Sequence, residues 1–150
     1  MSSKIKQKNK IKLKDTKEAV KYCNNCNPKK HLKFNFSFCK QKSEPAQYDA
    51  KELIEKLCFL SSDTYNNMMI KYKGNKKIFI ELISTDKLDI TIPAEFRLLY
   101  PTETNEKYGI FRIYSAGTPN GTANPRIIGM IKNTIFYIFF IDWKGPMYEH

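Results

Sequence analysis

The sequence has no long apolar run, no apolar segment near its start and no nucleotide-binding glycine loop. Its longest apolar run, Ile135–Ile141, has seven residues, and a membrane-spanning helix needs roughly 18. The first residues, MSSKIKQKNKIKLK, are basic but lack the apolar core of a secretory signal and the arginines of a mitochondrial presequence. The loop Ala116–Pro125 has two glycines but lacks the Lys-Ser/Thr of a P-loop. We therefore expect a cytoplasmic protein of bacterial or phage origin, with no membrane contact and no disulfides.

Acidic residues are scarce only at the beginning of the chain. Residues 1–42 hold thirteen Lys against Asp15 and Glu18, whereas residues 43–150 have equal numbers of acidic and basic side chains. The whole net charge of +11 therefore comes from the first 42 residues. A lysine-dense segment attracts polyanions through phosphate contact and counterion release. RNA, or a ribosome, is the predicted partner, and a solvated tail without a binding role is the alternative.

The chain of 150 residues is long enough for one domain with a core. We predict a basic arm over 1–22, disordered apart from a short helix over 15–22, and a single domain over 23–150. The lysines of the arm expected to contact nucleic acid are Lys4, Lys6, Lys8, Lys10, Lys12 and Lys14.

Periodicity predicts the order of elements in this domain. Residues 32–39 alternate, with Leu32, Phe34, Phe36 and Phe38 on one side, and predict a strand. A loop follows over 40–47, and then a helix over 48–60 with an apolar stripe of Leu53, Ile54, Leu57, Cys58 and Leu60. A second helix is predicted over 63–71, and a short strand or helical turn over 94–100. Strands are predicted over 78–83, 108–115, 126–131 and 135–142, with a hairpin turn at 132–133 between the last two. The fold class is therefore α+β: a small antiparallel sheet with two helices on one face, behind a flexible basic arm.

The chain has only three arginines against 23 lysines, so each arginine is unusual for this sequence. Arg112 and Arg126 flank one long loop, so pairing of their strands would bring them together. A guanidinium fork suits phosphate binding and stabilisation of a phosphorane. Arg97 is a further candidate for nucleic-acid contact. Ion pairs with Glu95, Glu103 or Asp142 are the alternative for all three.

The C-terminal segment offers a proton donor and acceptor. Tyr148 and His150 fall on the same side of an extended segment, and with a nearby arginine they are the groups needed to cleave RNA through its 2′-hydroxyl without a metal. Their structural alternatives are a packed edge aromatic and a frayed terminus.

The four cysteines include one close pair. Cys23 and Cys26, with His31 and Cys39, make a weak candidate set for zinc. Free thiols are the alternative, and no other cofactor is predicted.

The order of elements from Phe34 onward resembles that of the RelE/ParE-type toxin superfamily. The ending RIIGMIKNTIFYIFFID, from Arg126 to Asp142, closed by Met147-Tyr148, is similar to that family's arginine-led strand, tight turn, aliphatic strand and short His- or Tyr-bearing tail. The resemblance covers residues 32–150. It implies a toxin of a toxin–antitoxin pair that cleaves RNA or targets translation, with Arg112, Arg126, Tyr148 and His150 as catalytic residues and an antitoxin-like protein as partner.

Two other functions stay open at this point. One is a non-catalytic protein that binds nucleic acid or a ribonucleoprotein, and the other is a protein-interaction component of a phage or defence system.

Overall fold

A computed structural model describes residues 27, 29–42, 44–67, 80–114, 118 and 124–144. The predicted arm over 1–22, Cys23, Cys26, Tyr148 and His150 lie outside these residues. In chain order, the described elements are β1 Lys33–Asn35, β2 Lys40–Lys42, α2 Asp49–Ser61, β3 Ile80–Ser84, a 3₁₀ turn η1 Thr85–Lys87, α4 Ala94–Leu99, β4 Lys107–Arg112, β5 Arg126–Lys132 and β6 Ile135–Asp142.

The strands form one sheet in the order β1-β6-β5-β4-β3, and β2 also pairs with β6. The strands β3 to β6 follow one another as antiparallel neighbours. β1 and β2, in contrast, both run parallel to β6. The α+β class is thus confirmed, but the sheet is mixed along this edge. The parallel pairing is possible because the long connection through α2 separates β2 from the rest of the sheet.

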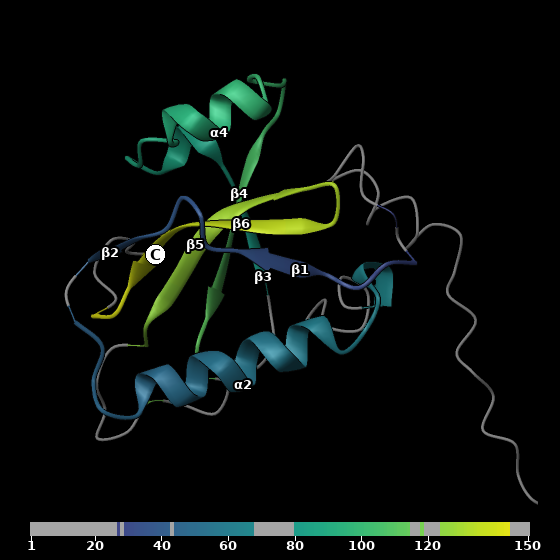
Figure 1. Ribbon diagram of the computed structural model, residues 1–150. Helices are drawn as coiled ribbons and strands as arrows, with labels where there is room; N and C mark the ends of the chain where they lie inside the picture. The colour runs from purple at the N-terminus through teal and green to yellow at the C-terminus, as the bar shows by residue number, and fades with distance from the viewer. Residues whose placement is uncertain are drawn as a thin grey trace, which may run out of the picture.

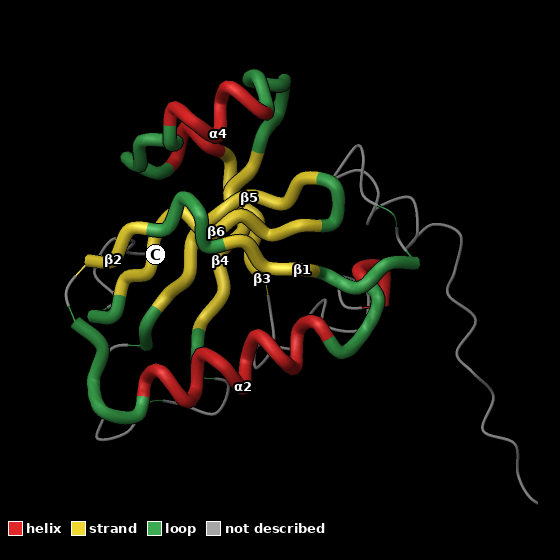
Figure 2. Tube along the Cα trace, viewed as in Figure 1, coloured by secondary structure: helices red, strands yellow, loops and turns green. Residues whose placement is uncertain are grey.

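Two apolar clusters cover the two faces of the sheet. Leu53, Leu57 and Leu60 of α2 pack with the inner residues of one face, while Phe96 of α4 packs against the other. Figures 1 and 2 show the sheet between α2 and α4. The two helices expected on one face are those predicted over 48–60, which is α2, and over 63–71, and α4 on the other face is a further helix. The predicted helix over 63–71 has only its first turn, Tyr65–Asn67, within the described residues.

Several predicted elements occur with changed limits. The predicted loop over 40–47 contains β2, and the segment 94–100 is the helix α4 rather than a strand. The hairpin turn lies at Asn133 and Thr134, one residue later than predicted, and both residues have positive φ. β6 is buried on both faces, as predicted for a central strand. None of the helices in the described ranges has the length and apolar character needed to cross a membrane.

The predicted apolar stripe on the first helix is only partly right. Leu53, Leu57 and Leu60 are buried, but the side chain of Ile54 is 59% exposed and Cys58 is also exposed. The helix therefore presents a narrower face to the sheet than its sequence predicted.

Candidate nucleic-acid interface

Arg112 and Arg126 are direct neighbours across two strands. Arg112 ends β4, Arg126 begins β5, and the two residues are paired in the antiparallel register. The same register on the other side of β5 pairs Arg126 with Asp142 of β6. The prediction that strand pairing brings Arg112 and Arg126 together is confirmed.

This charged row lies on the α4 side of the sheet. Ile110, two residues before Arg112, and Ile128, two residues after Arg126, both belong to the apolar cluster around Phe96. Since side chains alternate along a strand, Arg112 and Arg126 lie on that same face. Figure 1 shows the adjacent ends of β4, β5 and β6 from which the row is built.

The row changes from buried to exposed along its length. Asp142 is fully buried, Arg126 is half-buried and Arg112 is exposed. Like charges directly opposite each other on neighbouring strands destabilise a sheet, and the Asp142 carboxylate beside Arg126 offsets part of this repulsion. An anion bound at the solvent end of the row would reduce the repulsion between the two arginines further.

The chemistry of the row is that of phosphate binding. Guanidinium groups bind phosphate through two parallel hydrogen bonds and keep their charge at all working pH values. Asp142 also accepts a hydrogen bond at Oδ1 from the backbone N–H of Lys144, at 3.3 Å, which fixes the carboxylate at the end of β6. Tyr148 and His150, the predicted proton-transferring residues, lie outside the described residues, as do Lys4 to Lys14 of the arm.

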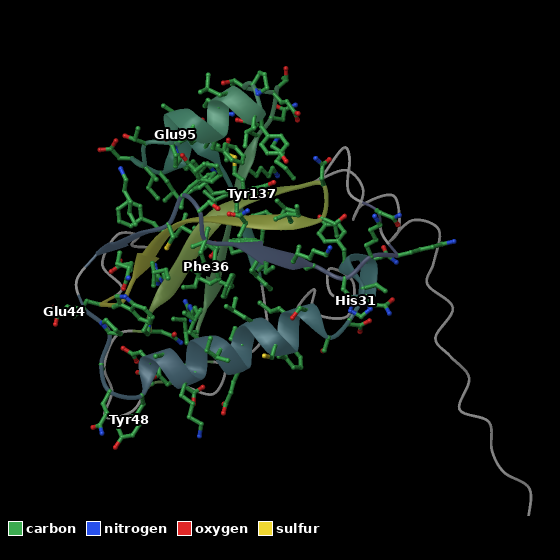
Figure 3. All side chains as sticks on the ribbon, viewed as in Figure 1. His31, Phe36, Glu44, Tyr48, Glu95 and Tyr137 are labelled. Carbon is green, nitrogen blue, oxygen red and sulfur yellow. The ribbon has the colours of Figure 1, made fainter. Side chains whose placement is uncertain are left out.

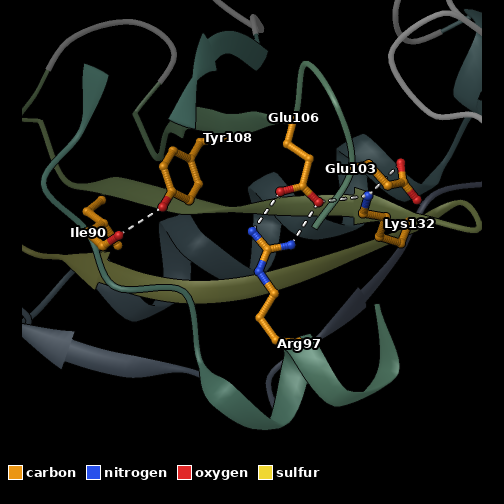
Figure 4. Close-up of polar contacts among 6 residues, drawn as sticks. All are labelled: Ile90, Arg97, Glu103, Glu106, Tyr108 and Lys132. Carbon is orange, nitrogen blue, oxygen red and sulfur yellow. Dashed lines mark hydrogen bonds and ion pairs between the residues drawn. The ribbon is translucent and has the colours of Figure 1, made fainter. Parts of the chain in front are cut away.

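Arg97 is placed elsewhere, in an ion-pair network that fastens α4 to the sheet. Its Nη1 and Nη2 donate to Oε1 and Oε2 of Glu106 at 2.8 and 2.6 Å. Lys132 of β5 lies 3.4 Å from Glu106 Oε1 and 3.2 Å from Glu103 Oε2. Figure 4 shows the network, together with the hydrogen bond from Tyr108 to the carbonyl of Ile90. Two cations thus face two carboxylates, which favours the structural alternative for Arg97 over phosphate contact.

The pKa values in this network follow from its geometry. Burial raises the pKa of Glu106, but the hydrogen bonds and charge of Arg97 outweigh burial, and the net pKa lies below its ordinary value. The hydrogen bond to Glu106 raises the pKa of Arg97, against the smaller effect of desolvation. The ion pair with Arg97 therefore persists to a lower pH than it would with a glutamate of ordinary pKa.

The two described members of the candidate zinc set do not come together. His31 precedes β1, and its Nδ1 donates to the carbonyl of Ser61 at 2.8 Å. Cys39 directly precedes β2, and burial raises the pKa of its thiol. The β1 and β2 pairings place these segments five residues apart along β6, or about 17 Å. One zinc ion with ligand bonds of about 2.0–2.3 Å does not bridge that distance.

No other group of three or more His, Cys, Asp or Glu side chains suited to a metal is found within the described ranges. Cys23 and Cys26 lie outside them.

Sequence reasoning missed the part that Asp142 plays in the arginine row. The sequence suggested Asp142 only as an ion-pair partner. Its position opposite Arg126 follows from a bulge between Ile128 and Gly129, which shifts the β5–β6 register. Gly129 is the signal for that bulge, since glycine inside a strand often marks one.

Comparisons of this chain with protein-family models, with curated protein sequences and with solved structures give no match.

Proposed function

We propose that this protein acts on RNA, and that Arg112 and Arg126 are its phosphate-binding residues. The observation that carries the proposal is the register that places the two guanidinium-bearing residues side by side at the exposed end of the sheet. Two adjacent guanidinium groups suit a phosphate diester, because each can bind it through two parallel hydrogen bonds. The thirteen lysines of residues 1–42 add a longer-range attraction for the same polyanion.

The test is RNA binding by the whole protein, measured by fluorescence anisotropy with a labelled RNA at low salt. Replacing Arg112 by alanine is expected to weaken binding about tenfold, and Arg112→Lys is expected to restore only part of the loss because the fork is missing. Lys51→Ala is the matched control. It removes one positive charge from an exposed position on α2, on the other side of the sheet. Equal affinities for the Arg112→Ala and Lys51→Ala variants would overturn the assignment of the row.

RNA cleavage in the manner of RelE/ParE-type toxins is the narrower form of this proposal. The order of elements supports it: an edge strand, the helix α2, and then the antiparallel strands β3 to β6. In that case Arg126 would stabilise the charge that develops on the phosphate, and Tyr148 and His150 would move protons.

Expression of the wild-type protein would then arrest growth, and an antitoxin-like protein would relieve the arrest. Arg126→Ala and Tyr148→Phe variants would each permit growth. Purified wild-type protein that binds RNA but leaves ribosome-bound and free RNA intact would exclude cleavage and leave the binding proposal in place.

A further inference from the structure

The sheet edge beside β6 is broken between β1 and β2, at residues 36–39. Asn35 pairs with Tyr137 and Lys40 pairs with Phe140, so four residues of this edge stand opposite only two residues of β6. The surplus residues cannot all stay in the plane of the sheet. The alternation of the sequence predicted that Phe36 lies inside with Phe34. In the structure Phe36 is instead 46% exposed. Figure 3 labels this residue.

Hydrogen bonds fix the turn that presents Phe36. Asn35 Oδ1 accepts the backbone N–H of Ser37 at 2.8 Å, which is the local bond typical of an Asx turn. The N–H of Cys39 donates to the carbonyl of Phe36 at 3.0 Å and closes the turn. The exposed ring is thus carried by a defined backbone rather than by a freely moving loop.

The aromatic residues on either side of Phe36 are anchored on opposite faces of the sheet. Phe34 packs against Phe111 and Phe136, with ring centroids 6.2 and 5.8 Å apart. Phe38 packs on the other side, with its ring centroid 5.9 Å from that of Phe96. With both neighbours held, Phe36 cannot turn inward without undoing one of these contacts.

The charged residues next to Phe36 in the sequence all have one sign. Residues 27–42 contain five lysines and no acidic residue. Lys33 and Lys40 are both exposed and flank Phe36, at positions that pair with Ile135 and Phe140 of β6. They are therefore about 17 Å apart along the edge, with the exposed ring between them.

The edge also leads toward the arginine row. Lys40 pairs with Phe140, and Phe140 pairs with Ile128 of β5. Arg126 is two residues from Ile128 on the same face, and β2 and β5 are separated only by β6, so their axes are about 10 Å apart. Lys40 and Arg126 therefore lie on the same face of the sheet, two strands apart.

We propose that a single-stranded nucleic acid docks along the broken β1–β2 edge, with one base stacked on Phe36 and the flanking phosphates held by Lys33 and Lys40. Exposed aromatic rings between basic side chains are the usual means of binding unpaired bases without sequence preference. A duplex keeps its base faces inside its own stack and cannot use such a ring. The inference deepens the RNA-binding function proposed above and rests on it.

The test compares a fluorescein-labelled oligouridine 12-mer with an RNA hairpin whose long paired stem leaves only a tight loop unpaired, using the whole protein at low salt. Phe36→Ala is expected to weaken oligouridine binding about tenfold and hairpin binding less than twofold. Phe36→Trp is expected to retain or increase affinity for oligouridine. Tyr48→Ala and Phe59→Ala are the matched controls, because their side chains are 60% and 40% exposed on or next to α2, and they are expected to change neither affinity.

The lysines are tested by salt dependence. The Lys33→Ala/Lys40→Ala double variant is expected to lower the slope of log K against log salt by about 1.4 for the single strand, which is the value for two lost phosphate contacts.

The outcomes separate this inference from the function on which it rests. Wild-type protein that binds neither RNA would overturn both. Normal RNA binding with no effect of Phe36→Ala, or an equal loss for oligouridine and hairpin, would overturn the stacking site alone. The urea midpoint of Phe36→Ala should match wild type because the ring is already exposed, and a lowered midpoint with unchanged RNA affinity would mark Phe36 as structural and overturn the inference.

Discussion

Tyr114 donates a hydrogen bond to the carboxylate of Asp49, with 2.5 Å between the phenolic oxygen and Oδ1, although 65 residues separate them in the sequence. Both side chains are buried. The second carboxylate oxygen of Asp49 accepts the backbone N–H of Ala46 at 2.6 Å. The pair joins the segment after β4 to the first turn of α2. Burial, and then the hydrogen bond and charge of Asp49, raise the pKa of Tyr114, so the hydroxyl stays a donor.

Removing the Tyr114 hydroxyl is expected to destabilise the fold. In Tyr114→Phe, Asp49 Oδ1 loses the hydroxyl donor while it stays buried, and a buried carboxylate oxygen that loses its donor costs about 2 kcal/mol or more. Urea denaturation followed by tyrosine and tryptophan fluorescence measures the loss. Tyr48→Phe is the control, because the Tyr48 side chain is 60% exposed. Equal unfolding free energies for the two variants would show that the Asp49 contact contributes nothing net.

The Arg97–Glu106 pair makes stability depend on pH in the acid range. The pKa of Glu106 is lower in the folded protein than in the unfolded chain, so the unfolded state binds more protons as pH falls. The contribution is present in full above the unfolded pKa and is lost as pH falls through the folded pKa.

Glu106→Gln is therefore expected to lower the free energy of unfolding at pH 7 and to flatten its dependence on pH below about pH 4.5. Thermal unfolding between pH 3 and pH 7 measures both effects. Glu55→Gln is a suitable control, since Glu55 forms an exposed ion pair with Lys51 on α2. An unchanged slope for Glu106→Gln would place the acid sensitivity in other carboxylates.

Gly129 is expected to tolerate no side chain. A Cβ at this position would lie 2.0 Å from the carbonyl oxygen of Tyr137 and 2.8 Å from Phe136 Cε1. The backbone of the bulge would have to move, so Gly129→Ala is expected to cost about 3 kcal/mol or more.

Gly109→Ala provides a graded comparison in the neighbouring strand. Its Cβ would meet the ring of Phe136 at 2.8 Å but no backbone atom at a shorter distance. A side-chain ring can shift, so we expect a smaller loss of stability than for Gly129→Ala. A larger loss for Gly109→Ala in chemical denaturation would contradict the close backbone approach at the bulge.

The orientation of α2 predicts different effects for two apolar residues of the same helix. Leu57→Ala is expected to destabilise the protein by about 2–5 kcal/mol, since the side chain is buried in the core. Ile54→Ala is expected to change stability by less than about 0.5 kcal/mol, because Ile54 is 59% exposed. Urea midpoints of the two variants measure the difference, and similar losses would indicate that α2 is rotated or that Ile54 is covered in solution.

Near-neighbour patterns and composition were enough to predict part of the fold and part of the candidate site. The charge of the first 42 residues, the helix over 48–60, the antiparallel strands of the C-terminal half and the closeness of Arg112 to Arg126 were all predicted. Helical and strand periodicity act over a few residues, and a hairpin places the residues flanking its turn opposite each other. These inferences needed no knowledge of distant contacts.

Long-range contacts set the position at which the aromatic strand over 32–39 breaks and the face of the sheet on which each helix lies. The alternation of apolar and polar residues over 32–39 predicted that Phe36 would lie inside. The pairings of β1 and β2 with two separate parts of β6 turn it outward. Thr134, a β-branched residue with φ of 63°, is likewise held by long-range hydrogen bonds from the backbone N–H groups of Asn27 and Lys33. Contacts between residues about a hundred positions apart fix these conformations against local preference, and local sequence patterns do not record them.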